Sequence, residues 1–109
     1  DTSALTAIGN DFSFNEIFSR QIESIGKPGD IAIGITTSGK SKNVINALKL
    51  AKKKKIISVI LTKKKYPNKQ HLKKISDLIL GVPANETARI QELHILVGHL
   101  MCAVIDEEF

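Results

Sequence analysis

Three short apolar segments that alternate with helical patterns constrain the fold of this chain more than any other feature. The segments cover residues 30–35, 56–61 and 78–82, and isoleucine, leucine and valine dominate them. Short continuous apolar runs are typical of strands that are buried on both faces of a parallel sheet. Because helical patterns separate the runs, we expect an α/β fold with a three-layer, doubly wound parallel sheet, whose ligands gather at the carboxyl ends of the strands.

The segments between these strands carry apolar residues at helical spacing. The spacing predicts helices over 13–25, 41–54 and 69–75, and a final helix from Asn85 to about residue 107. A polar connection over 62–68 joins the second strand to the third helix. Three strands make a thin sheet, so we expect a further strand or a partner subunit to complete it.

The composition is that of one globular domain. Of the 109 residues, 42% are hydrophobic and 25% are charged, and no repeat or linker divides the chain. The net charge of +5 comes largely from lysines between positions 49 and 74, including the runs 52–55 and 63–65. The first run falls at the end of a predicted helix, where cations complement the dipole, and no aromatic residues interleave with it to stack on bases. We therefore expect a solvated basic face and no nucleic-acid partner.

The cysteine content and the apolar stretches bear on the cellular setting. A single cysteine, Cys102, cannot form an internal disulfide, and its apolar helical context predicts a buried side chain in a reducing, cytoplasmic protein. The longest apolar stretch, 93–105, is interrupted by His94, Gly98 and His99 and is too short to span a bilayer. No signal-peptide pattern opens the chain, so we expect no membrane association.

Residues 36–41, directly after the first predicted strand, have the composition of an anion-binding loop. Gly39 tolerates a positive φ, neighbouring hydroxyls and backbone N–H groups can point inward, and the first turn of the next helix adds partial positive charge. A phosphate would fit there. An ordinary strand-to-helix turn with Ser41 as the N-cap has the same composition, so both interpretations stay open at this point.

The final helix carries a polar stripe. Gln91, Ile95 and His99 follow one another at i, i+4 steps, so Gln91 and His99 share one side of the helix, and Gly98 leaves room beside them. An amide and an imidazole so placed could bind a metal or hold and protonate a sugar oxygen. The alternative is that both are core or interface residues satisfied by hydrogen bonds, and two ligands alone fall short of a zinc site. His94 lies off this stripe, and we expect it to be structural.

Five segments together carry the motifs of a known family. They are 5–12, 17–21, 28–30, 34–44 and 88–95, and they include the strings GNDF, GITTSGKS and ARIQELHI. Together they resemble the phosphoheptose isomerases, also called sedoheptulose 7-phosphate isomerases, which are sugar isomerase (SIS) domain proteins with a flavodoxin-like sheet. The resemblance covers nearly the whole chain and implies one SIS domain over residues 1–109.

The resemblance implies roles for eight side chains. The family's hydroxyl loop binds the sugar phosphate, and the corresponding residues here are Thr36, Thr37, Ser38 and Ser41. The family's Gly-Asn-Asp segment contacts the substrate, which corresponds to Asn10 and Asp11. Gln91 and His99 would be zinc ligands, with Gln91 also touching the substrate and His99 acting in proton transfer.

The activity implied by the resemblance is that of an aldose–ketose isomerase. It would convert sedoheptulose 7-phosphate to D-glycero-D-manno-heptose 7-phosphate through an enediol, for the heptose of lipopolysaccharide or capsule, in a homotetramer with active sites between subunits. Two alternatives remain open. One is a non-catalytic SIS module that binds a replication initiator protein, and the other is a domain that senses sugar phosphates without turnover.

The resemblance also implies that part of the family's site lies outside these residues. A family member begins with N-terminal helices, a first strand, a Gly-Asn-Gly-Gly-Ser loop and a helix whose histidine and glutamate supply the other zinc ligands and the catalytic base. We therefore expect that this chain, which starts at Asp1, is the C-terminal part of such an enzyme and is inactive alone. Two departures stand out: Lys40 replaces a common asparagine, and residues 63–68 replace a glycine-rich turn.

Overall fold

A parallel three-stranded sheet forms the centre of the protein, as the sequence predicts. In the computed structural model, which describes residues 1–66 and 69–109, the strands are β1 (Ile31–Ile35), β2 (Ile57–Lys63) and β3 (Leu78–Val82). Their order is β1-β2-β3, so β2 is central. The predicted connection over 62–68 lies partly outside the described residues, which leave out positions 67 and 68.

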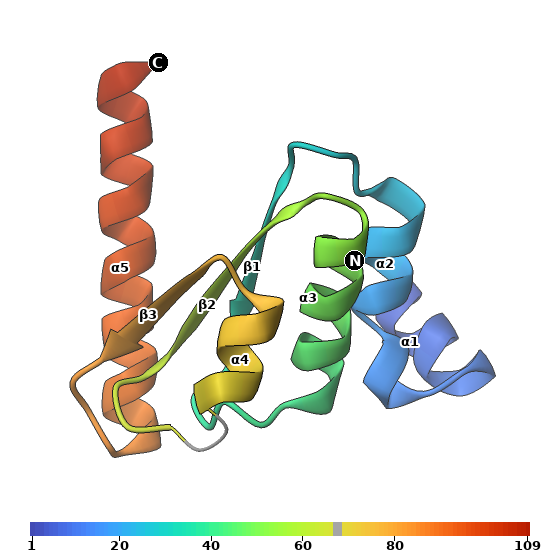
Figure 1. Cartoon of the computed structure of the whole chain (residues 1–109), viewed down its shortest axis with the longest axis horizontal. Helices are drawn as coiled ribbons and strands as arrows, with labels where there is room; N and C mark the ends of the chain where they lie inside the picture. Colours follow the sequence, from blue (N-terminus) through green and yellow to red (C-terminus); the bar gives the residue numbers. More distant parts are fainter. Residues whose placement is uncertain (67–68) are drawn as a thin grey trace.

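Helices cover both faces of this sheet. Figure 1 shows α4 (Lys69–Ile75) in front of the strands, α3 (Lys42–Lys53) on their right, and α5 (Thr87–Glu108) on their left with β3 crossing in front of it. The expected three-layer α/β arrangement is therefore confirmed. Between the helices α3 and α4 and the sheet lies the main core cluster, which consists of Val44, Leu48, Ile60, Leu72 and Ile75.

The N-terminal third differs from the prediction. The expected helix over 13–25 is broken into a 3₁₀ turn, η1 (Phe14–Glu16), and a short helix, α2 (Ser19–Ile25). The hydroxyl of Ser19 donates to the carbonyl of Glu16 at 3.2 Å, a local bond that competes with the regular helical ladder. An unpredicted helix, α1 (Thr2–Asp11), precedes the turn; Asp1 caps it by accepting from the Ser3 N–H at 2.9 Å.

Part of the first lysine run is structural. The Nζ of Lys54 donates to the carbonyl oxygens of Ile22 and Glu23, at 3.3 and 2.7 Å, in the last turn of α2. A cation at this position satisfies carbonyls that have no partner within the helix and complements its dipole. Lys52 lies 3.8 Å from Asp77 in an exposed ion pair, and Lys53 and Lys55 are exposed as well, so the rest of this run agrees with the predicted solvated face.

The back of the sheet and the outer half of α5 expose apolar side chains. In β1, Ile31, Ile33 and Ile35 are 62%, 44% and 57% exposed. The outward edge of β1 pairs with no strand among the described residues, and a cavity of about 560 Å³ runs along it towards α2. Completion of the sheet by a further strand or subunit stays a prediction, and this open edge agrees with it.

Helix α5 corrects two expectations. The helix has 22 residues, so by length and composition it could cross a membrane, and the premise that its apolar stretch is too short was wrong. Length and apolarity alone also fit a helix that another protein surface covers. Figure 1 shows the C-terminal half of α5 projecting beyond the strands, and Cys102 in this half is exposed instead of buried.

Gly34 allows β1 and α3 to approach closely. A Cβ atom at this position would lie 2.7 Å from Cγ1 of Val44 and 2.8 Å from Cδ1 of Leu48, both in the core cluster. By contrast, a Cβ at Gly98 on α5 would meet no described atom within 4 Å. Glycine is therefore required by packing at the first position and not at the second.

We expect Gly34→Ala to lower the free energy of unfolding by about 1–3 kcal/mol, because the added methyl group forces Val44 and Leu48 from their positions. Gly98→Ala is the matched control and should leave stability unchanged or raise it by up to about 1 kcal/mol, since alanine favours the helix. Urea denaturation measures both. Equal effects of the two substitutions would contradict the close approach.

Candidate functional site

The loop 36–41 joins the carboxyl end of β1 to the start of α3, where doubly wound folds bind ligands. Its hydroxyls form an internal network. The Oγ1 of Thr36 lies 2.8 Å from the Oγ of Ser41 and accepts the N–H of Gly39 at 3.2 Å. Thr36 is only 4% exposed, so its hydroxyl supports the loop from beneath, and direct contact with a phosphate stays a prediction for this residue.

The position of Ser41 as the N-cap of α3 is confirmed, and binding of a phosphate by this loop stays a prediction. Ser41 occupies the N-cap position, but its side chain makes no capping hydrogen bond in the described structure, because its hydroxyl lies against Thr36. In the first turn of this 12-residue helix, the N–H of Val44 donates to Oδ1 of Asn43 at 2.8 Å, which leaves the N–H groups of Lys42 and Asn43 beside the loop. With Gly39 at a φ of +70°, this arrangement is suited to an anion.

The remaining loop residues differ in exposure. Ser38 is exposed and its Oγ accepts the N–H of Lys40 at 3.1 Å, while Thr37 is half-buried. These two hydroxyls, together with that of half-buried Ser41, are the ones that a bound phosphate could reach from solvent. The four hydroxyls predicted for phosphate binding thus gather in one loop, but they divide into one buried support and three accessible groups.

Asn10 and Asp11 lie apart from this loop. Both are exposed at the end of α1, and the Nδ2 of Asn10 donates to Oδ1 of Asp11 at 2.9 Å. Figure 1 shows α2 and α3 between α1 and the sheet, and α1 itself contains no buried residue. The described chain therefore does not bring these predicted substrate contacts against the hydroxyls, and a role for them stays a prediction.

On α5 the polar side chains divide between two sides. His94 is buried, and its Nε2 lies 3.2 Å from the carbonyl oxygen of Thr62, so Nε2 carries the proton; the expected structural role of His94 is confirmed. Gln91 and His99 are exposed, which contradicts the core part of the alternative that they are core or interface residues; the interface part stays a prediction. Five residues correspond to about 140° around a helix, so His99 points away from the sheet on which His94 packs.

The described residues do not form a complete metal site around Gln91 and His99. The described residues contain no group of three or more histidine, cysteine, aspartate or glutamate side chains that could hold an ion. Eight residues along a helix correspond to about 12 Å, and zinc ligands bind at about 2.0–2.3 Å, so both side chains would have to extend towards each other to share one ion. Zinc binding by Gln91 and His99 therefore stays a prediction, and it needs further ligands from outside the described residues.

Thr62 is the residue that the sequence analysis missed. It is fully buried at the carboxyl end of β2, and its Oγ1 has no hydrogen-bond partner among the described residues. A Cβ atom at Gly39 would lie 3.5 Å from this oxygen, so the hydroxyl lies beneath the loop. The available signal was a threonine at the end of an apolar strand, adjacent to the predicted phosphate site.

Comparisons with known proteins agree with the resemblance. No protein-family model matches the chain. A phosphoheptose isomerase from Sulfurimonas denitrificans is 52% identical over 108 residues, and phosphoheptose isomerase 1 from Campylobacter jejuni is 50% identical over 109. The chain is a relative of the phosphoheptose isomerases. It spans about half the length of these curated relatives, 54% and 57%, while 99% and 100% of its own residues are aligned.

Solved phosphoheptose isomerase structures share the fold. The enzyme from Neisseria gonorrhoeae superposes with a TM-score of 0.88 at 48% identity, covering 96% of this chain and 58% of that one. The enzyme from Francisella tularensis gives a TM-score of 0.90 at 36% identity, with 98% and 56% covered. Both confirm that the α/β architecture described above is that of the phosphoheptose isomerase fold.

We expect Thr36→Val to lower the free energy of unfolding by about 1–3 kcal/mol, because it leaves the buried N–H of Gly39 without its acceptor. Ser38→Ala, in the same loop but exposed, should change stability by less than about 0.5 kcal/mol. Denaturant titration of both variants makes the comparison. A neutral Thr36→Val would show that its hydroxyl does not hold the loop.

Proposed function

We propose that the protein is a phosphoheptose isomerase that interconverts sedoheptulose 7-phosphate and D-glycero-D-manno-heptose 7-phosphate, for the heptose of lipopolysaccharide or capsule. The observation that carries the proposal is that a relative 52% identical over 99% of this chain is a phosphoheptose isomerase. The structure supports it with an anion-suited loop at the carboxyl end of β1 and an exposed amide and imidazole on α5.

The loop would hold the phosphate end of the sugar. The exposed hydroxyl of Ser38 and the first-turn N–H groups of α3 would donate to the phosphate oxygens, while Thr36 keeps the loop in shape from below. Such contacts are the same in the ground and transition states, so they fix the substrate and its orientation. Asn10 and Asp11, with Gln91, would contact the sugar itself.

At the other end of the sugar, the reaction moves a proton between adjacent carbons. A base removes a proton from C1 of the ketose, the carbonyl oxygen at C2 is protonated to give the enediol, and return of a proton to C2 with loss of the O1 proton gives the aldose. We assign proton transfer to the exposed imidazole of His99. Gln91 and His99 would also hold zinc, which when bound stabilises negative charge on the enediol oxygens.

The proposed site lies between subunits of a homotetramer. His99 points away from the sheet of its own chain, so groups that complete the site have to approach from outside that chain's described residues. Exposed apolar residues of α5 support burial against other protein; they are Ile95, Leu96, Leu100, Val104 and Ile105, each 52–59% exposed. A soluble, cytoplasmic enzyme without membrane or nucleic-acid partners is the setting that fits this function.

Turnover by the full-length protein tests the proposal. The protein is incubated with sedoheptulose 7-phosphate and zinc in deuterated water, and NMR follows the aldoheptose 7-phosphate. Deuterium at C2 of the product would support the isomerase and the enediol. Sugar-phosphate binding without product would favour a sensor module, and capture of a replication initiator protein without turnover would favour the binding module.

We expect His99→Ala to lower kcat by about 10²–10⁴-fold, the usual contribution of a general acid–base group. Phosphate binding should stay nearly intact, since the hydroxyl loop lies on the other side of β2 from α5. His71→Ala, at an exposed position on α4, is the matched histidine control and should retain activity. Unchanged turnover in His99→Ala would remove this residue from the mechanism.

The assembly makes a separate prediction. Leu100→Glu places a charge on the exposed apolar side of α5, so we expect it to shift the full-length protein to smaller species in sedimentation velocity. Ser24→Glu adds the same charge at an exposed position of α2 and should leave the sedimentation coefficient unchanged. A tetramer that persists in Leu100→Glu would exclude this face as the interface.

A further inference from the structure

The side-chain hydroxyl of Thr62 is buried without a hydrogen-bond partner among the described residues. The residue is 0% exposed, and its Oγ1 has no hydrogen-bond partner within residues 1–66 and 69–109. A buried hydroxyl without a partner destabilises a fold, and such groups are rare in native proteins. Valine has nearly the same shape and favours strands, so packing alone does not explain a threonine at this position.

Hydrogen bonds from α5 and from the end of β1 hold the backbone around this hydroxyl in place. The carbonyl of Thr62 accepts from Nε2 of His94 at 3.2 Å, and the carbonyl of Leu61 accepts from the N–H of Thr36 at 3.0 Å. Gly39, at a φ of +70°, passes directly over the side chain, since its Cβ position lies 3.5 Å from the Oγ1 of Thr62. The hydroxyl of Thr62 is therefore held beneath the loop 36–41, close enough for it to form a hydrogen bond with that loop.

The polar groups of the loop are now paired with one another. The hydroxyls of Thr36 and Ser41 lie 2.8 Å apart, and the N–H of Gly39 donates to Thr36. An anion in the loop competes for these donors, because hydrogen bonds to a charged phosphate are stronger than those between neutral groups. If the hydroxyls turn towards the anion, a loop backbone group needs a new partner, and a hydroxyl both donates and accepts.

We propose that Thr62 is a positioning residue whose buried hydroxyl bonds to the backbone of the loop around Gly39 when that loop binds phosphate. The inference rests on the proposed function, because it takes the phosphate of the sugar as the ligand of the loop. It adds a residue from β2 that never touches the ligand. Because the hydroxyl has no partner within residues 1–66 and 69–109, we expect it to lower the stability of the ligand-free protein and to stabilise the loop in the bound state.

Thr62→Val separates this role from a structural one. We expect the melting temperature of the ligand-free full-length protein to stay the same or to rise, since an unpartnered hydroxyl is removed. The Kd for inorganic phosphate, measured by calorimetry, and the KM for sedoheptulose 7-phosphate should rise about fivefold, the equivalent of one neutral hydrogen bond. The value of kcat should change little, and Thr62→Ser should restore both constants.

Ser58→Ala provides the matched control. Ser58 is also fully buried and lies on the same face of β2, but at the far end of the strand, where its hydroxyl is within 3.4 Å of the Ile56 carbonyl. Its removal should leave phosphate affinity unchanged.

An unchanged Kd in Thr62→Val, or a fall in melting temperature that accompanies the loss of affinity, would overturn the inference. Lack of isomerase activity in the wild type would overturn the proposed function alone, whereas lack of phosphate binding would overturn both.

Discussion

The burial of β2 on both faces is the constraint on which the rest of the structure depends. Ile60 packs into the core cluster on one side, while Val59 and Leu61 face the other side, where α5 lies. Parallel strands require cover on both faces, and here α3 and α4 cover one face and α5 covers the other. By holding β2, these helices also bring the end of β1, the loop after it and the start of α5 to the same edge of the sheet (Figure 1).

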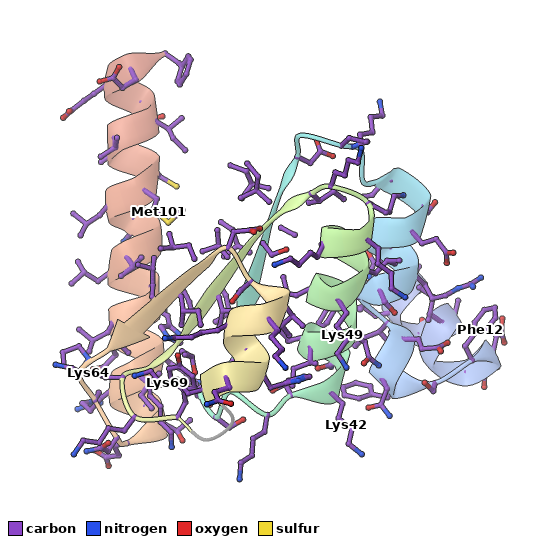
Figure 2. All side chains as sticks on the ribbon, viewed as in Figure 1. Phe12, Lys42, Lys49, Lys64, Lys69 and Met101 are labelled. Carbon is purple, nitrogen blue, oxygen red and sulfur yellow. The ribbon has the colours of Figure 1, made fainter. Side chains whose placement is uncertain are left out.

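The two halves of the proposed site have different structural support. The hydroxyl loop is closed within the chain, with Thr36 buried beneath it and Gly39 packed over Tyr66 and Thr62. The stripe of Gln91 and His99 is open to solvent, and only its neighbour His94 is anchored to the sheet. Figure 2 shows side chains of α5, among them Met101, standing clear of the strands over much of the helix. The proposed phosphate loop is thus positioned by its own chain, whereas the proposed catalytic stripe needs further protein around it.

The spacing of apolar residues predicted the three strands and the helices α3, α4 and α5, because it shows directly which side chains are buried in these elements. It failed for α1 and for the break before α2, where few side chains are buried and a single bond from Ser19 competes with the helix. It also failed for Cys102, which is exposed, because apolar helical spacing does not show whether residues of the same chain pack against that side of the helix. The hydroxyl loop was predictable as an anion site, but which hydroxyl is buried was not: the bond between Thr36 and Ser41 and the isolation of Thr62 depend on packing across strands.

The unpaired outer edge of β1 affects how residues 1–109 would behave as an isolated polypeptide. Proteins protect exposed strand edges with lysines, prolines, bulges or short strands, and the sequence Ile-Ala-Ile-Gly-Ile of β1 contains no charge and no proline. Its backbone N–H and C=O groups are therefore a template for intermolecular strand pairing, flanked by exposed isoleucines that favour association. In residues 1–109 on their own, we expect intermolecular strand pairing to begin at this edge, and a strand or subunit that covers it would remove the template.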